Sequence, residues 1–156
     1  MERLFTIVRA NLDPVAPERV RKACRAIVWD DGRLLLVRSR KYGDVKFPGG
    51  GAEPGERAFE TLRRETAEET GYRLKTRIQP FGMTREYGRD DGNHGTFCNE
   101  SRYYVCGVYP TPGVQHLSEY EIEHRYEPVW MTPEAAADQN DSVPDDPAIP
   151  WKQRET

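Results

Sequence analysis

The stretch from Gly49 to Tyr72, GGGAEPGERAFETLRRETAEETGY, joins a glycine-rich turn to a segment that predicts a short helix over 57–70. The last two turns of that helix carry Glu65, Glu68 and Glu69. Carboxylates at i, i+3 and i+4 lie on one helical face, so these groups repel one another unless a cation lies between them. Magnesium is a hard cation that takes oxygen ligands and commonly shares one or two carboxylates with a phosphate. The stretch therefore predicts a metal-phosphate site.

Glu69 differs from an ordinary surface glutamate because the helix turns it towards the apolar side. At about 100° per residue, Glu69 lies about 40° from Glu65 and close to the azimuth of Leu62. Burying an unpaired carboxylate is costly, so we expect Glu69 to be paired with a cation or bound to a metal. The alternative is that Arg63 and Arg64 simply neutralise an acidic amphipathic helix, since such charge pairs are common.

The glycines favour the metal-phosphate interpretation over that alternative. Gly49–Gly51 and Gly55 permit backbone conformations, and a close approach of a ligand, that other residues forbid. The turn also leads into a helix N-terminus, where free N–H groups and the helix dipole favour anions. A glycine turn, an anion-binding helix start and a carboxylate cluster together indicate a site for a metal and a phosphate.

The box formed by these residues resembles the signature of the Nudix hydrolases. Gly50 is followed after five residues by Glu56, and after seven more by RETAEETGY at 64–72. The chain departs from the family pattern at two hydrophobic positions: Thr66 stands where an aliphatic residue is usual, and Tyr72 closes the box. Neither position supplies a metal ligand in the family, so the departures concern packing.

The resemblance continues outside the box, in RLLLV at 33–37 and PVWMTPEA at 128–135. It implies an α/β (α+β) Nudix fold, with a mixed β-sheet sandwiched between helices. It also implies cleavage of the pyrophosphate bond of a nucleoside diphosphate linked to another moiety, by attack of metal-activated water on phosphorus. A non-catalytic Nudix-like sensor of a nucleotide or metabolite is the alternative.

The resemblance assigns roles to the acids. Glu65 and Glu69 would hold Mg²⁺, Glu68 would share a second ion, and the Gly50 carbonyl would complete a coordination shell, with Mn²⁺ as another metal that fits. Glu68 is the candidate for the base that takes the water proton, and Glu69 is the alternative. The sequence does not separate the two because coupled carboxylates share their titration.

Further residues are candidates for supporting roles. By analogy, Glu56 and Arg64 form a pair that fixes the loop against the helix. Related enzymes often use another acid from a loop before the last strand, and Glu121 and Glu123 are the candidates here. The alternation of acids at 119–123 favours the solvated face of a strand for any one of them. Candidates for substrate binding are Arg85, Tyr87 and Arg102, with core or surface roles as the alternative.

Composition limits the class of protein. The chain has 156 residues, a formal charge of −3 and 31% charged residues, which argues against a binder of nucleic acid polymers. It has no apolar run of membrane-spanning length, and its N-terminal apolar stretch is too short for a signal peptide. Cys24, Cys98 and Cys106 form no close pair, so we expect reduced thiols and a cytoplasmic location. Dimers are common among similar proteins, so a homodimer is one expected state.

The pattern along the chain predicts three parts. These are an N-terminal extension or edge strand at 1–19, a Nudix hydrolase domain at 20–140 and an irregular Pro/Asp-rich C-terminal tail at 141–156. The polar, glycine-rich segment 88–95 predicts a mobile hairpin tip. Strands are expected at 20–29, 33–39, 74–87, 101–109 and 125–131, and a closing helix at 133–140.

Overall fold

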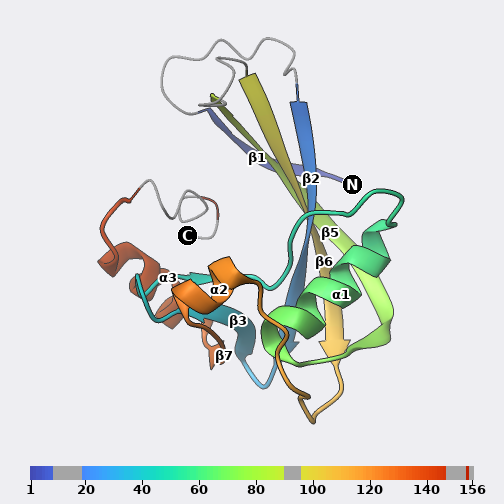
Figure 1. Cartoon of the computed structure of the whole chain (residues 1–156), viewed down its shortest axis with the longest axis vertical. Coiled ribbons are helices and arrows are strands. Elements are labelled where there is room, and N and C mark those ends of the chain that lie inside the picture. The colour runs from blue at the N-terminus through green and yellow to red at the C-terminus, as the bar shows by residue number, and fades with distance from the viewer. Residues whose placement is uncertain (9–18, 90–95, 147–153, 155–156) are drawn as a thin grey trace.

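A computed structural model describes residues 1–8, 19–89, 96–146 and 154 (Figure 1). Among these residues, no helix combines the length and the apolar character needed to cross a membrane. The elements are β1 Arg3–Val8, β2 Arg19–Asp30, β3 Arg33–Ser39, β4 Val45–Lys46, α1 Ala58–Thr70, β5 Leu74–Arg89, β6 Thr96–Val108, α2 Glu119–His124, β7 Tyr126–Met131 and α3 Pro133–Ser142.

The strands of the described residues form a seven-stranded mixed sheet in the order β1-β5-β6-β2-β3-β4, with β7 paired to the side of β3. β1 runs parallel to β5 and β2 runs parallel to β6, whereas the other pairs are antiparallel. In Figure 1 the long strands β2, β5 and β6 stand in the middle, with α1 on one side and α2, α3, β3 and β7 on the other. The predicted mixed α+β architecture is confirmed.

The sheet is covered on both faces because its central strands alternate between two cores. Leu35 of β3 packs with Leu62 of α1 in one core. Its neighbours Leu34 and Leu36 point the other way and pack with Ala136 of α3. The run of apolar residues in β3 is therefore shared between helices on opposite faces.

Helix α1 begins and ends as its sequence predicts. The Arg57 backbone N–H donates to the Glu60 carboxylate at 2.9 Å, which satisfies one of the free donors at the helix start. At the other end Gly71 adopts φ 76°, the left-handed conformation that lets a helix stop. The helix thus carries the three box acids on its last two turns.

The structure corrects the prediction for the acids at 119–123. They form helix α2 rather than the solvated face of a strand. The Ser118 backbone N–H donates to the Glu121 carboxylate at 2.7 Å, and Arg125 ends the helix with φ 55°. The capping contact between Ser118 and Glu121 favours a helix, although the acids alternate along the sequence as they would on a strand.

Other predictions differ from the structure mainly at their boundaries. β6 begins at Thr96, five residues before the predicted strand, and α3 extends to Ser142. Residues 90–95 of the predicted hairpin tip lie outside the described residues, and Gly88 and Arg89 continue β5. The three cysteines are free and buried, as expected for reduced thiols.

Candidate active site

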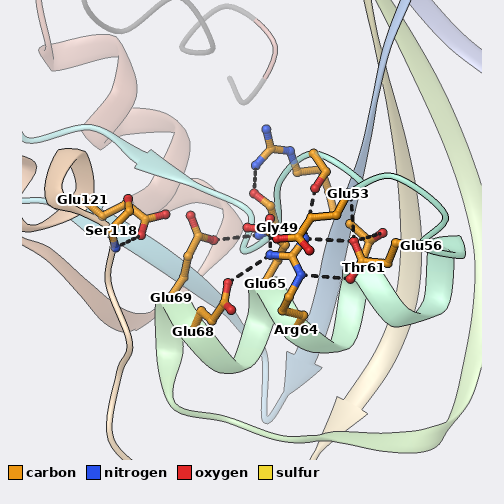
Figure 2. A network of polar contacts seen from close by, with 12 residues as sticks. Gly49, Glu53, Glu56, Thr61, Arg64, Glu65, Glu68, Glu69, Ser118 and Glu121 are labelled. Atoms are coloured by element: carbon orange, nitrogen blue, oxygen red, sulfur yellow. Dashed lines mark hydrogen bonds and ion pairs between the residues drawn. The ribbon is translucent and has the colours of Figure 1, made fainter.

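The predicted acids lie together as a row on the last two turns of α1. Figure 2 shows Glu65, Glu68 and Glu69 projecting from the side of the helix that meets the glycine loop. Their exposure falls steeply along the row: the Glu68 side chain is 39% exposed, Glu65 14% and Glu69 1%. We call these three residues the acid row. Glu68 is its solvent-exposed member and Glu69 its buried member.

Glu69 is buried and paired with a cation, as the helical periodicity predicts. One carboxylate oxygen accepts from Lys46 Nζ at 2.7 Å, and the other accepts from the Gly49 backbone N–H at 2.7 Å. Sequence reasoning missed Lys46, which β4 brings to the acid row. The only sequence signal was a lone lysine within the otherwise apolar strand before the glycines.

Arg64 connects the glycine loop to the helix. Its guanidinium donates to Glu56 through Nε and Nη2, both at 2.9 Å, and to the Gly51 carbonyl at 3.1 Å. The predicted Glu56–Arg64 pair therefore forms. This pairing, with the Glu53 backbone N–H and the Thr61 hydroxyl, lowers the pKa of Glu56 to about 2.

Two glycines let the loop approach the helix and the sheet closely. A Cβ atom at Gly50 would lie 2.3 Å from an oxygen of the Glu65 carboxylate, so a larger residue there would displace that carboxylate. Gly49 has φ 137°, and a Cβ on it would lie 2.0 Å from the Cys24 carbonyl oxygen. The Gly50 carbonyl accepts from the Cys24 N–H at 2.9 Å, and the Gly49 carbonyl accepts from Arg25 Nη1.

The electrostatics of the row favour a bound cation. Burial, followed by the neighbouring Glu69 carboxylate, raises the pKa of Glu65, while Arg64 and Arg25 act in the opposite direction. A carboxyl group whose pKa is raised in this way gains from a positive charge placed between it and its neighbour. Perturbed carboxylates of this kind are typical of functional sites.

The positive charges that contact the acid row in this structure come from the side chains of Lys46 and Arg64. Arg64 Nη1 bridges Glu65 at 2.9 Å and Glu68 at 3.0 Å. Among the described residues, no group of three or more Asp, Glu, His or Cys side chains is gathered closely enough to hold a metal ion. The donor set nevertheless suits Mg²⁺, because it offers carboxylate and carbonyl oxygens. Arg64 would keep Glu56 and Gly51 as partners if Glu65 and Glu68 turned to a metal.

The sequence was compared with models of known protein families. A family model described as the NUDIX domain matches residues 19–152. The chain belongs to the Nudix family.

Several known proteins are similar to this chain in sequence. Nucleoside triphosphatase NudI of Escherichia coli O17:K52:H18 (strain UMN026 / ExPEC) is 32% identical over 117 residues, covering 69% of this chain and 79% of the relative. A MutT-like protein of Streptomyces ambofaciens is 29% identical, with 72% of this chain and 63% of the relative covered. The mouse nucleoside diphosphate-linked moiety X motif 6 is 36% identical over 80 residues, which cover 50% of this chain and only 24% of that protein.

Solved structures support the Nudix fold. A NUDIX hydrolase from Nitrosomonas europaea aligns with a TM-score of 0.56 at 18% identity, covering 87% of each chain. A MutT NUDIX hydrolase from Burkholderia pseudomallei aligns with a TM-score of 0.54 at 21% identity, covering 89% of this chain and 99% of the other. At these identities the likeness concerns the fold alone.

The two acids proposed from α2 differ in their surroundings. Glu123 is exposed and pairs with Lys41 Nζ at 2.5 Å. Glu121 caps its own helix, and its charge and that of Glu69 both contribute to the raised pKa of Tyr126, for which burial is the main cause. Glu121 is therefore engaged in capping α2 through the Ser118 N–H.

The predicted substrate-binding arginines are held in ion pairs on β5 and β6. Arg85 and Arg102 both pair with the buried Glu100 carboxylate, at 3.1 Å and 2.7 Å. Strand register puts Arg85 opposite Glu100, and Tyr87 follows on the same face of β5. The pair between Arg85 and Glu100 ties β5 to β6.

Proposed function

We propose that this chain is a divalent-metal-dependent pyrophosphohydrolase that cleaves the pyrophosphate bond of a nucleoside di- or triphosphate compound. Mg²⁺ is the proposed metal and Mn²⁺ the alternative. The observation that carries the proposal is the acid row beside the glycine loop, with Glu69 buried at 1% exposure against Lys46. Carboxylates held this close repel one another, so the arrangement suits a ligand that brings metal ions.

Each acid has a distinct proposed role. Glu65 and Glu69, with the Gly50 carbonyl, would hold one ion, and Glu68 would share a second. When bound, divalent ions neutralise charge on phosphate oxygens and make a bound water more acidic. Glu68 is the proposed base because its side chain is 39% exposed and can meet water. Glu69 is the weaker candidate because its side chain is only 1% exposed.

The proposed substrate class is drawn from the relatives. One is named a nucleoside triphosphatase, and another is named for a nucleoside diphosphate linked to a further moiety. Incubation with nucleoside triphosphates, nucleotide sugars and dinucleoside polyphosphates, each with Mg²⁺ or Mn²⁺, should release phosphate-bearing products. Absence of turnover with either metal would overturn the proposal. Tight nucleotide binding in calorimetry without product would favour the sensor instead.

A substitution in the acid row gives a sharper test. Glu68→Gln should lower kcat by about 100-fold or more, because a general base commonly contributes 10²–10⁴. Glu60→Gln is the matched control, since Glu60 lies on the same helix and pairs with exposed Arg57 at 2.6 Å. Equal kcat values for the two variants would remove Glu68 from the role of base.

Two further features stay predictions. The cytoplasmic location rests on the cysteines, and the homodimer rests on similarity alone. Light scattering of the purified protein measures its mass directly, and a monomeric value would dismiss the dimer.

A further inference from the structure

A cavity of about 380 Å³ lies at the end of the molecule where β2 turns into β3 (Figure 1). Its walls come from the end of β2, the starts of β3 and β5, the end of β6, β7 and Tyr72, which follows the end of α1. None of the residues that line it belongs to the acid row or to the glycine loop. We call it the β2–β3 cavity, and it is separate from the candidate active site.

Three aromatic side chains line the β2–β3 cavity: Trp29, Tyr72 and Trp130. The rings of Tyr72 and Trp130 meet edge-on with centroids 5.9 Å apart, and Trp130 Nε1 donates to the Tyr72 hydroxyl at 3.3 Å. These two contacts fix the pair. Trp29 is 54% exposed, a large open area for an indole. The cavity therefore presents one fixed aromatic pair and one accessible indole to a ligand.

Tyr72 gives this wall a feature of the chain's own sequence. It closes the box at one of the two hydrophobic positions where the chain departs from the family pattern. The structure shows that its ring is half-buried and that its hydroxyl is used by Trp130. The departure thus contributes to packing and, at the same time, to the cavity wall.

The charged residues of the cavity are mainly basic. Arg33 and Lys75 line it together with a single acid, Asp30. Within the part of the chain that the structure describes, neither basic side chain forms an ion pair. The Lys75 stem lies against Gly107, where a Cβ atom would be 3.3 Å from Lys75 Cδ. A basic excess in a chain whose formal charge is −3 marks this place as attractive to anions.

The combination of rings and charges selects among ligand classes. Aromatic walls alone suit either a cation, through cation–π contacts, or another flat ring. Arg33 and Lys75 repel a cation, so the ring is the better match. Guanidinium groups bind phosphate and carboxylate through paired hydrogen bonds, and ammonium groups add a point charge. The volume also lies within the range of small-molecule sites.

We propose that the β2–β3 cavity binds a small anionic molecule that carries a flat aromatic ring. The ring lies against Trp29, and the phosphate or carboxylate group of the ligand contacts Arg33 and Lys75. This inference goes beyond the proposed function, because it concerns a second site that shares no residue with the acid row.

Calorimetry on the full chain tests the ligand class. EDTA is present throughout, so that no divalent ion is available to the acid row. Adenosine 5′-monophosphate is the phosphate probe and indole-3-acetate is the carboxylate probe. At least one should bind with a Kd below about 1 mM, and the one that binds identifies the anionic group. Adenosine and inorganic phosphate should each bind about tenfold more weakly or worse. The absence of binding by both anionic probes would overturn the proposal.

Removal of the two basic groups tests the anion contact. The double variant Arg33→Gln with Lys75→Gln should weaken binding of the probe by about tenfold or more, because hydrogen bonds to charged groups are lost. The matched control is Lys22→Gln with Arg77→Gln, which removes the same charge from exposed positions outside the cavity. Equal weakening in the two double variants, or no weakening in the first, would show that the probe binds elsewhere.

Substitutions of Trp29 test the ring contact. Trp29→Ala should weaken binding about tenfold, in line with the loss of one aromatic stacking partner. Phe81→Ala is the control, since Phe81 is 55% exposed on β5 and does not line the cavity. Trp29→Phe keeps a ring, so binding should persist while most of the quenching of tryptophan fluorescence by the probe disappears. Quenching that survives in Trp29→Phe would contradict the proposed position of the ring.

None of these measurements depends on turnover. A protein that hydrolyses no nucleotide and still binds the probe in the β2–β3 cavity would refute the hydrolase proposal and support this one. Hydrolysis without binding of either probe in EDTA would do the reverse.

Discussion

Arg64 shows how one residue can organise the acid row. It contacts the glycine loop through Gly51, the loop-helix junction through Glu56, and the row itself through Glu65 and Glu68. Lysine could not replace it, because a single ammonium group cannot present a rigid fork of donors to several acceptors. The spacing of the box therefore encodes a network as well as a set of candidate ligands.

The Glu56 carboxyl group should make stability depend on pH. Its pKa falls from 4.5 to about 2 in the folded chain, mainly through Arg64. Because the folded pKa is the lower one, the stabilisation is complete above pH 4.5 and is lost as the pH falls towards 2. Urea unfolding across that window should show a steeper loss of stability for wild type than for Glu56→Gln. Parallel curves would contradict the expectation.

Helix α1 depends on its C-terminal end being held by the segment that precedes α2. The Gly71 carbonyl accepts from the Gly113 N–H at 2.8 Å, and the Glu68 carbonyl accepts from the His116 N–H at 2.9 Å. These bonds satisfy carbonyls that a helix end leaves free. They also fix the turn that carries Glu68 and Glu69.

Two glycine substitutions, one at each side of α1, separate backbone strain from steric clash. Gly71 and Gly55 have φ of 76° and 83°, so alanine at either position costs about 1–2 kcal/mol in strain. A Cβ at Gly71 would also lie 2.3 Å from the Gly113 carbonyl oxygen, whereas Gly55 has open space. Gly71→Ala should lower the free energy of unfolding by about 2–5 kcal/mol in urea titrations. A loss no larger than that of Gly55→Ala would refute the clash.

Local sequence patterns predicted most of the helices and strands, but the prediction for α2 was wrong. The 3.6-residue periodicity predicted α1, and strand-like runs on either side of a turn signal predicted β2 and β3. Helix α2 was mistaken for a strand because six residues hold too little periodicity to separate the two structures. Its capping contact from Ser118 to Glu121 was the signal that would have decided the matter.

At the scale of the whole molecule, a helix on the far face of the sheet positions the site. Asn140 of α3 is fully buried, and its amide accepts from the Val45 N–H at 2.9 Å and donates to the Val45 carbonyl at 3.0 Å. Val45 precedes Lys46, which holds Glu69. The contact therefore links α3, β4 and the acid row of α1 into one rigid arrangement.

Asn140→Ala should affect both stability and activity. It leaves the Val45 N–H and carbonyl buried without their partner, which costs about 2–5 kcal/mol. A shift of Lys46 should then lower kcat/KM in the same preparation. Asp138→Ala is the control, since Asp138 is exposed on the same helix. Unchanged unfolding in urea would show that β4 is held by other contacts.

The sequence alone determined helix α1 and the acid row, because these depend on residues close together in the chain, and its resemblance to the family supplied the α+β class and the Glu56–Arg64 pair. Periodicity and spacing carry that information directly. Only the tertiary structure joined Lys46 to Glu69, and Arg154 to Glu86. It likewise assembled the Glu100 pairs from Arg85 and Arg102. Such contacts depend on sheet register and on how layers pack, and a single stretch of sequence does not encode either.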